Sequence, residues 1–180
     1  MLARSYAERS KSQFEELSDN VFVGKLLNNL GGLEFLLGKP DEAIGRLNEA
    51  FEVVLEHGDD VEVATVVSSL AQVQLKTGDP VKAEENARHA LERLGSREDQ
   101  LAEIGNARLV LGRALLEQGR LDEAEVAFAD AEASYADLGS ASHRAATWVA
   151  RGDLASRRGD HERAAELYRM AAEALQDVRF

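Results

Sequence analysis

Residues 27–51 read LNNLGGLEFLLGKPDEAIGRLNEAF, and this stretch decides the fold. The pattern predicts two helices joined by a tight turn at Gly38–Lys39. A glycine at this place supplies the left-handed backbone conformation that commonly ends a helix. Pro40 then suits the first turn of the second helix, where a missing N–H costs nothing. The stretch therefore predicts one pair of antiparallel helices.

The same skeleton occurs three more times along the chain. Glycines 78, 119 and 159 take the place of Gly38, at steps of 40, 41 and 40 residues. Each glycine is followed five residues later by one alanine and twelve residues later by another: Ala43 and Ala50, Ala83 and Ala90, Ala124 and Ala131, Ala164 and Ala171. The residue seven positions before each glycine is small: Gly31, Ala71, Gly112 and Gly152. A recurring period of this size indicates a stacked helical array.

Close packing explains why the recurring residues are small. Two antiparallel helices approach to about 8–10 Å where small residues cross. Gly31 and Ala43 are expected to allow this contact within a pair, and Ala50 to accept the next pair. The predicted fold is all-α, a right-handed superhelical solenoid of antiparallel helix pairs with about nine helices.

The skeleton resembles the tetratricopeptide repeat (TPR) over roughly residues 24–178. The clearest copies are Leu27, Leu30, Gly31, Ala43, Leu47 and Ala50, and then Trp148, Gly152, Ala164, Tyr168 and Ala171. The chain departs from the family pattern at Glu34, Gln74 and Arg151, where large apolar residues are usual. Its period is about 40 residues instead of about 34. Repeats of this length, with LNNLG and an HGD or LGS connection, are also similar to the C-terminal repeat regions of bacterial helix-turn-helix transcription regulators.

The repeats divide the chain into segments of one solenoid domain. Residues 1–18 are expected to be the second helix of a truncated repeat or an N-terminal cap, followed by repeats at 19–59, 60–95, 96–139 and 140–180. The first helix of the third repeat is predicted from about Arg97 to Gln118, with Ser96 and Asp99 as its capping signal. Two interpretations of the start remain open, an excised piece of a longer protein or a complete chain with a lone capping helix.

The C-terminal end also leaves two interpretations open. Apolar residues continue through the last helix to Phe180, and solenoids usually need a polar terminal repeat. Either Phe180 folds back over the end, or two chains form a homodimer through it.

Composition excludes several functions for this segment. The net charge is −12 and the isoelectric point about 4.8, which argues against direct contact with nucleic acid. Cysteine is absent, so disulfides and thiolate metal sites are excluded. No apolar run reaches membrane-spanning length, and the charged N-terminus does not resemble a signal peptide. These features favour a cytoplasmic location.

No pattern of catalytic or metal-binding residues is present. The four histidines, His57, His89, His143 and His161, lack metal-ligand spacing. The glycines fall at turns and helix crossings, so no phosphate loop is formed. We therefore expect no enzyme activity, no cofactor and no metal.

The family resemblance implies that the first helix of each pair lines a concave, peptide-binding groove. The candidate groove residues are Lys25, Asn28, Asn29, Phe35, Ser69, Gln72, Lys76, Asn106, Leu109, Arg113, Val149, Asp153 and Arg157. Amide side chains can bond a peptide backbone as donor and acceptor, and the apolar members can contact side chains. The charges on the full inward-facing set give a small positive excess, so the acidic residues are expected on the convex side.

Some members of the family clamp the C-terminal carboxylate of a bound peptide. Lys25 and Asn29 match the first pair of that clamp. Ser69 replaces its next asparagine, and Asn106 and Val110 replace its last pair, so the clamp is incomplete. Two function classes therefore remain: the ligand-sensing or oligomerising domain of a transcription regulator, and a stand-alone scaffold or adaptor for protein complexes.

Overall fold

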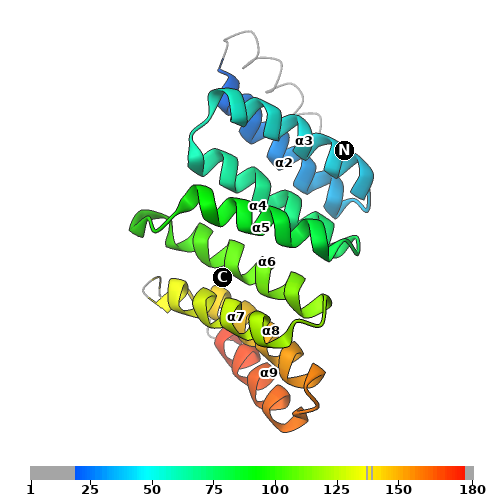
Figure 1. The fold of residues 1–180 in the computed structure, drawn as a ribbon, viewed down its shortest axis with the longest axis vertical. Coiled ribbons are helices and arrows are strands. Elements are labelled where there is room, and N and C mark those ends of the chain that lie inside the picture. Colours follow the sequence, from blue (N-terminus) through cyan, green and yellow to red (C-terminus); the bar gives the residue numbers. More distant parts are fainter. Residues whose placement is uncertain (1–18, 137, 139, 177–180) are drawn as a thin grey trace. The chain divides into compact units, whose positions relative to one another are not determined.

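The computed structural model describes residues 19–136, 138 and 140–176. These residues form eight α-helices, one short 3₁₀ helix and no strand, which confirms the predicted all-α class. The predictions for residues 1–18 and for Phe180 lie outside the described residues. The elements, labelled in Figure 1, are α2 (Asn20–Leu36), α3 (Pro40–His57), α4 (Asp60–Lys76), α5 (Pro80–Leu94), η1 (Glu98–Gln100), α6 (Leu101–Glu117), α7 (Leu121–Ala136), α8 (Ala141–Arg157) and α9 (His161–Gln176).

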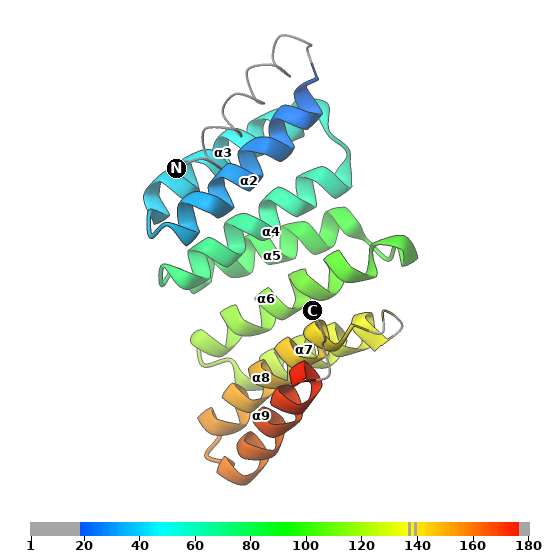
Figure 2. The ribbon, with the colours of Figure 1, turned by 180° about the vertical axis from the view of Figure 1, so that it is seen from behind.

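The chain forms two compact units, called here unit 1 (residues 1–95) and unit 2 (residues 96–180). In unit 1, α2 packs on α3, α4 packs on α5, and both helices of the first pair contact α4. In unit 2, α6 packs on α7, α8 packs on α9, and both helices of the first pair contact α8. The labelled helices of these pairs can be followed in Figures 1 and 2. The pairs are those that the period predicts, and one continuous solenoid domain remains a prediction.

The turn within each pair has the predicted left-handed glycine. The φ angles of Gly38, Gly78, Gly119 and Gly159 are 75°, 85°, 76° and 82°. At the first turn, the N–H of Gly38 donates to the carbonyl of Phe35 and that of Lys39 to the carbonyl of Glu34, each at 3.0 Å. This double hydrogen bond is the Schellman motif, which satisfies carbonyls that the helix end leaves open.

Three of the second helices begin with a proline in the first turn, as in α3 and α5, or with an aspartate cap, as in α5 and α9. Asp79 accepts a hydrogen bond from the N–H of Lys82 at 3.2 Å, and Asp160 from that of Arg163 at 3.0 Å. The Lys82 side chain also bonds Asp79 and, as the first cause, lowers the pKa of that carboxyl. Both aspartates therefore act as N-caps of their helices.

Small residues lie at the helix crossings, as the close-packing argument predicts. A Cβ added to Gly31 would lie 2.7 Å from Cγ of Leu47 and 3.2 Å from the Ala43 carbonyl oxygen. A Cβ added to Gly112 would lie 2.4 Å from the Phe128 ring. Real Cβ atoms do not approach so closely, so glycine is required where these helices meet.

One predicted helix start is wrong. The first helix of the third repeat begins at Leu101 instead of about Arg97, and no side-chain cap from Ser96 or Asp99 holds it. Arg97 has an extended backbone, with φ −70° and ψ 117°, so the helix cannot pass through it. Residues 98–100 form the short 3₁₀ helix η1, in which the Gln100 N–H donates to the Arg97 carbonyl at 3.1 Å.

The departures from the family pattern are polar contacts between helices. Glu34 is buried, and its Oε1 atom lies 3.7 Å from Nε of Arg46 on α3. Gln74 on α4 accepts a hydrogen bond from Asn86 on α5 at 2.7 Å. Arg151 on α8 donates to Glu132 on α7 at 2.6 Å. Each polar residue therefore finds a partner on the helix beside it, as buried polar groups require.

Candidate functional site

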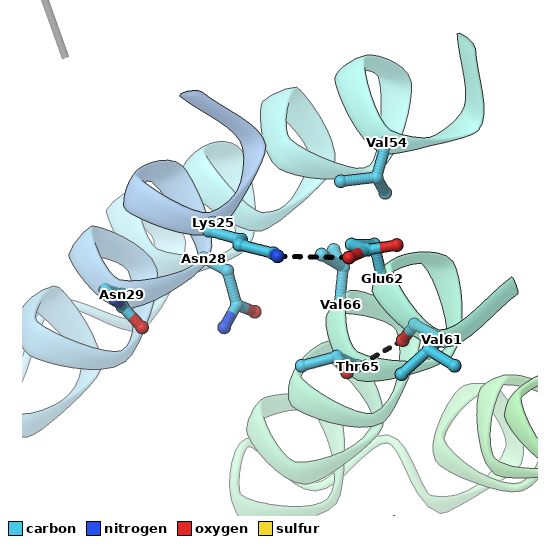
Figure 3. Close-up of a pocket in the computed structure, with 8 residues that line it drawn as sticks. All are labelled: Lys25, Asn28, Asn29, Val54, Val61, Glu62, Thr65 and Val66. Carbon is cyan, nitrogen blue, oxygen red and sulfur yellow. Dashed lines mark hydrogen bonds and ion pairs between the residues drawn. The ribbon is translucent and has the colours of Figure 1, made fainter. Parts of the chain in front are cut away.

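Unit 1 contains a cavity of about 320 Å³ between α2, α3 and α4. Figure 3 shows the side chains that line it. They are Lys25, Asn28 and Asn29 from α2, Val54 from α3, and Val61, Glu62, Thr65 and Val66 from α4. The volume is at the lower end of the range of about 300–1,000 Å³ found for ligand pockets. Three of the candidate groove residues predicted from the sequence thus meet at one cavity.

An ion pair joins the two sides of the cavity. Lys25 reaches from α2 and places its Nζ atom 3.0 Å from Oε1 of Glu62 on α4, as Figure 3 shows. The second carboxylate oxygen of Glu62 accepts a hydrogen bond from the backbone N–H of Asp59 at 3.0 Å. Asp59 in turn accepts from the N–H of Glu62, which completes a capping box at the start of α4. Glu62 is therefore held in place by its own helix while it neutralises Lys25.

Asn28 contributes the oxygen of its side-chain amide, a hydrogen-bond acceptor, to the cavity. Its Oδ1 atom is buried and makes no hydrogen bond to any part of the chain that the structure describes. A buried acceptor left in this state costs about 1–3 kcal/mol relative to one that is satisfied. A ligand that donates a hydrogen bond here would recover that free energy.

The rest of the lining is apolar or already satisfied. Val54 and Val66 are buried, and Val61 is half-buried. The hydroxyl of Thr65 donates to the Val61 carbonyl at 2.8 Å, so it is engaged within its own helix. The cavity therefore combines an apolar wall, a neutralised ion pair and one unsatisfied acceptor.

The other predicted groove residues of unit 1 lie away from the cavity. Phe35 packs against the buried cluster that contains Leu47 and Leu70. The Ser69 hydroxyl donates to the carbonyl of Thr65 at 3.1 Å. Gln72 and Lys76 are exposed on α4. The last two side chains are accessible to a partner, whereas Phe35 is partly used by the core.

The predicted groove residues on α6 in unit 2 are largely engaged inside the unit. Asn106 accepts a hydrogen bond from the hydroxyl of Tyr135 at 2.8 Å. Leu109 is buried, so it presents little surface to a ligand. Arg113 is half-buried. Among these three side chains, burial argues against the predicted ligand contact for Leu109.

On α8, the three predicted groove residues differ in their surroundings. Val149 is exposed. Asp153 accepts a hydrogen bond from the Tyr168 hydroxyl at 2.8 Å, which is the first cause of the raised pKa of that tyrosine. Arg157 pairs with Glu117 on α6, with an N–O distance of 3.2 Å. Glu62, which does not belong to the predicted inward-facing set, thus offsets part of the small positive charge expected on the lining.

Five of the eight lining residues are not among the candidate groove residues. Thr65 belongs to the full inward-facing set, whereas Val54, Val61, Glu62 and Val66 do not. Val54 lies on a second helix, whereas the prediction considered only first helices. Val61 and Glu62 lie at the start of α4, and Val66 lies on its packing side. A signal was present, because an alignment of the repeats with one another places Val54 opposite a large aromatic residue, Tyr135.

The described residues contain neither a metal-binding cluster nor a membrane-spanning helix. No group of three or more histidine, aspartate or glutamate side chains lies close enough together to hold a metal ion. None of the described helices has the length and hydropathy needed to cross a membrane.

Comparisons with known proteins identify the repeats. Two family models, each of the tetratricopeptide repeat, match residues 22–96 and 68–139, which together span more than half of the chain. No curated protein matches the sequence.

Solved structures resemble the fold. BtubC (BKLC) from P. vanneervenii is 20% identical, with a TM-score of 0.81, and the match covers 99% of this chain and 75% of that one. MamA is 17% identical, with a TM-score of 0.61, covering 93% of this chain and 86% of that one. At such identities the likeness shows the fold alone.

Proposed function

The chain belongs to the tetratricopeptide-repeat family, and from that premise we propose that it binds a peptide segment of a protein partner through the cavity of unit 1. The observation that carries the proposal is the buried, unpartnered Oδ1 atom of Asn28 within this cavity. A protein-interaction role is the ordinary role of the family, and the unpartnered acceptor in this cavity supports the cavity as the proposed site.

The surroundings of the cavity suit an extended peptide. Asn29 is exposed at its edge, and its amide can both donate to and accept from a peptide backbone. Gln72 and Lys76 continue the exposed polar surface along α4. Backbone hydrogen bonds at these amides would supply affinity, and the cavity would select one side chain. The proposed role is binding without catalysis.

The test is a screen of displayed random peptides against the purified full chain. Binders are then measured on two matched variants, Asn29→Ala at the cavity edge and Asn48→Ala on the exposed side of α3. We expect Asn29→Ala to weaken binding at least about fivefold, since it removes one or two hydrogen bonds. Asn48→Ala should leave binding unchanged. Binders that respond equally to both variants would place the site elsewhere.

Two wider roles are proposed for such a binding module. The first is the ligand-sensing or oligomerising domain of a bacterial transcription regulator, which would act in the cytoplasm. Its support is the resemblance of the 40-residue repeats and of LNNLG to the repeat regions of those regulators. The second is a scaffold or adaptor that holds two proteins together. A helix-turn-helix segment encoded upstream in the same gene would favour the first role, and its absence from the complete gene would favour the second.

Self-association belongs to the first role and is tested separately. Light scattering of the full chain over a range of concentrations would detect the proposed homodimer. Truncation after Gln176, the end of α9, should return it to a monomer if the C-terminal end forms the contact. A dimer that survives this truncation would contradict the proposed contact.

A further inference from the structure

The two units can be aligned position by position, because their turn glycines differ by a constant number. Gly119 follows Gly38 by 81 residues, and Gly159 follows Gly78 by 81 residues. The alignment therefore pairs Gly24 with Gly105 and Val54 with Tyr135. The geometry agrees independently: a Cβ added to Gly24 would lie 2.6 Å from Val54, and one added to Gly105 would lie 2.4 Å from Tyr135. Each glycine thus faces the equivalent side chain of its own unit.

In unit 2, the side chain of Tyr135 fills the place that corresponds to the cavity. Tyr135 is fully buried, and its hydroxyl donates to Oδ1 of Asn106 at 2.8 Å. Its ring stacks on His143, with the ring centroids 4.6 Å apart and the planes at 27°. Asn106 and His143 are the counterparts of Lys25 and Glu62, which line the cavity of unit 1. The same architecture therefore holds a phenol in unit 2 and an open cavity in unit 1.

The cavity of unit 1 exists because valine replaces the tyrosine. Val54 is also fully buried, but its side chain ends at two methyl groups and leaves the space in front of it open. Asn28, which lies beside this space, has Leu109 as its counterpart, and Leu109 needs no hydrogen bond. Among the described residues of unit 1, no aromatic ring takes this place, and the Oδ1 acceptor of Asn28 has no donor.

We propose that the cavity of unit 1 receives a tyrosine side chain of the protein partner, with the phenol hydroxyl donating to Oδ1 of Asn28. This inference rests on the proposed function, because it names the side chain that the bound peptide contributes. The partner's tyrosine supplies the ring and the hydroxyl that Tyr135 supplies within unit 2.

The charges around the cavity favour a neutral donor over an ion. Lys25 and Glu62 pair with each other at 3.0 Å, so each charge is already neutralised without a charged ligand. A phosphate or carboxylate would meet the carboxylate of Glu62, and a cation would meet the ammonium of Lys25. A purely aliphatic side chain would leave Oδ1 of Asn28 unsatisfied, which is costly for a buried acceptor. A phenol is neutral, donates one hydrogen bond and presents an apolar ring to the valines.

The test uses p-cresol, the side-chain analogue of tyrosine, with toluene as the analogue that lacks the hydroxyl. Binding to the full chain is followed by amide chemical shifts in ¹⁵N-labelled protein. We expect p-cresol to bind about fivefold more tightly than toluene, the ratio that one hydrogen bond provides, with the largest shifts at the cavity residues. Equal affinities, no saturable binding, or tighter binding of indole than of p-cresol would overturn the assignment.

Three variants locate the binding. Val54→Tyr copies unit 2 and should fill the cavity, so that p-cresol binding is lost. Leu55→Tyr makes the same change at the neighbouring exposed position and should leave binding unchanged. Asn28→Leu copies Leu109 and should reduce the preference for p-cresol over toluene to about one, whether or not Val54→Tyr folds. Unchanged p-cresol binding in Val54→Tyr, with a folded spectrum, would refute the inference.

The failure of this inference can be told apart from the failure of the proposed function. Peptides that bind and respond to Asn29→Ala, but contain no tyrosine, would retain the function and refute the tyrosine assignment. Specific p-cresol binding without any peptide binder would support the subsite and refute the peptide role.

Discussion

Unit 1 and unit 2 have the same helix pairs and turns but different interiors. In unit 1 the interior positions include two polar pairs, Glu34 with Arg46 and Gln74 with Asn86. The counterparts in unit 2 are apolar, and all four are buried: Leu115, Ala127, Ala155 and Leu167. Where unit 2 places Tyr135, unit 1 has Val54 and a cavity. The comparison teaches that turn glycines and small crossing residues set the scaffold, while the positions between them are free to carry either packing or recognition.

The largest difference is expected on truncating the equivalent residues Tyr135 and Val54. Tyr135→Ala should lower the free energy of unfolding by about 4 kcal/mol, because it removes a fully buried ring and leaves a cavity. Val54→Ala should cost only about 2 kcal/mol, since it removes two methyl groups next to a space that is already open. Urea unfolding followed by circular dichroism measures both values. Equal losses would mean that Tyr135 does not fill unit 2 as described.

The polar pairs of unit 1 provide a second comparison. Arg46→Ala takes the guanidinium away from the buried Glu34 carboxylate and should cost about 3 kcal/mol, because breaking a buried pair leaves an uncompensated charge. The double variant Glu34→Leu with Arg46→Ala copies Leu115 and Ala127 and should be close to neutral or stabilising.

Chemical unfolding of both variants decides this comparison. Exposed Arg88→Ala, which breaks an ion pair on α5, is the matched control and should change stability by less than about 0.5 kcal/mol. A double variant that is less stable than Arg46→Ala alone would show that unit 1 depends on its polar pair.

Most of the fold could be predicted from the sequence, and the particular residues show why. Gly38 and its equivalents predict the turns, because these positions need a positive φ. Gly31 and Gly112 predict helix crossings, because a side chain there would collide with the neighbouring helix. The break before α6 was missed because it depends on the extended backbone of Arg97, for which no residue pattern is diagnostic.

The candidate site was predicted only in part. The expectation that first helices line the groove selected Lys25, Asn28 and Asn29, which share a helix face because they are three and four residues apart. They line one cavity, and peptide binding by them stays a prediction. The cavity itself depends on the size of one side chain on a neighbouring helix, Val54. The hydrogen bond of Asn106 likewise depends on Tyr135. Such features follow from packing between helices and not from the period along one helix.

A third, smaller difference concerns the hydroxyl of Tyr135 and its pH dependence. Tyr135→Phe leaves Oδ1 of Asn106 without its donor and should cost about 1 kcal/mol at neutral pH. Burial raises the pKa of Tyr135 above its ordinary value of 10.0, with Arg113 opposing and Glu103 adding to the shift.

The sign of the pH dependence follows from that raised pKa. The unfolded chain releases the phenol proton at lower pH than the native chain does. The contribution of Tyr135 to the stability of the native state is therefore fully present below pH 10 and decreases as the pH rises above 10. Thermal unfolding of the parent and of Tyr135→Phe is measured between pH 7 and about 11. The difference in stability between the two proteins should become smaller as the pH rises, because only the parent loses stability through this tyrosine. A constant gap would mean that the tyrosine is not protected by burial.

The smallest difference is expected between the two ion pairs that join first helices. In unit 1, Lys25 pairs with Glu62, and the Glu62 side chain is 18% exposed. In unit 2, Arg157 pairs with Glu117, and the Glu117 side chain is 51% exposed. Exposed pairs contribute about 0–1 kcal/mol, so Arg157→Ala should change stability by less than about 0.5 kcal/mol.

Lys25→Ala should also leave stability nearly unchanged, because Glu62 keeps its hydrogen bond to the backbone of Asp59. It should nevertheless change recognition, since Glu62 then carries an uncompensated negative charge beside the cavity. We expect the variant to bind protonated tyramine, a phenol with a cationic tail, more tightly than the parent does, whereas Arg157→Ala should not. An identical response of both variants to tyramine would mean that the Lys25–Glu62 pair is only a surface contact, like the Arg157–Glu117 pair in unit 2. Different responses would separate a pair that controls the charge of a cavity from one that does not.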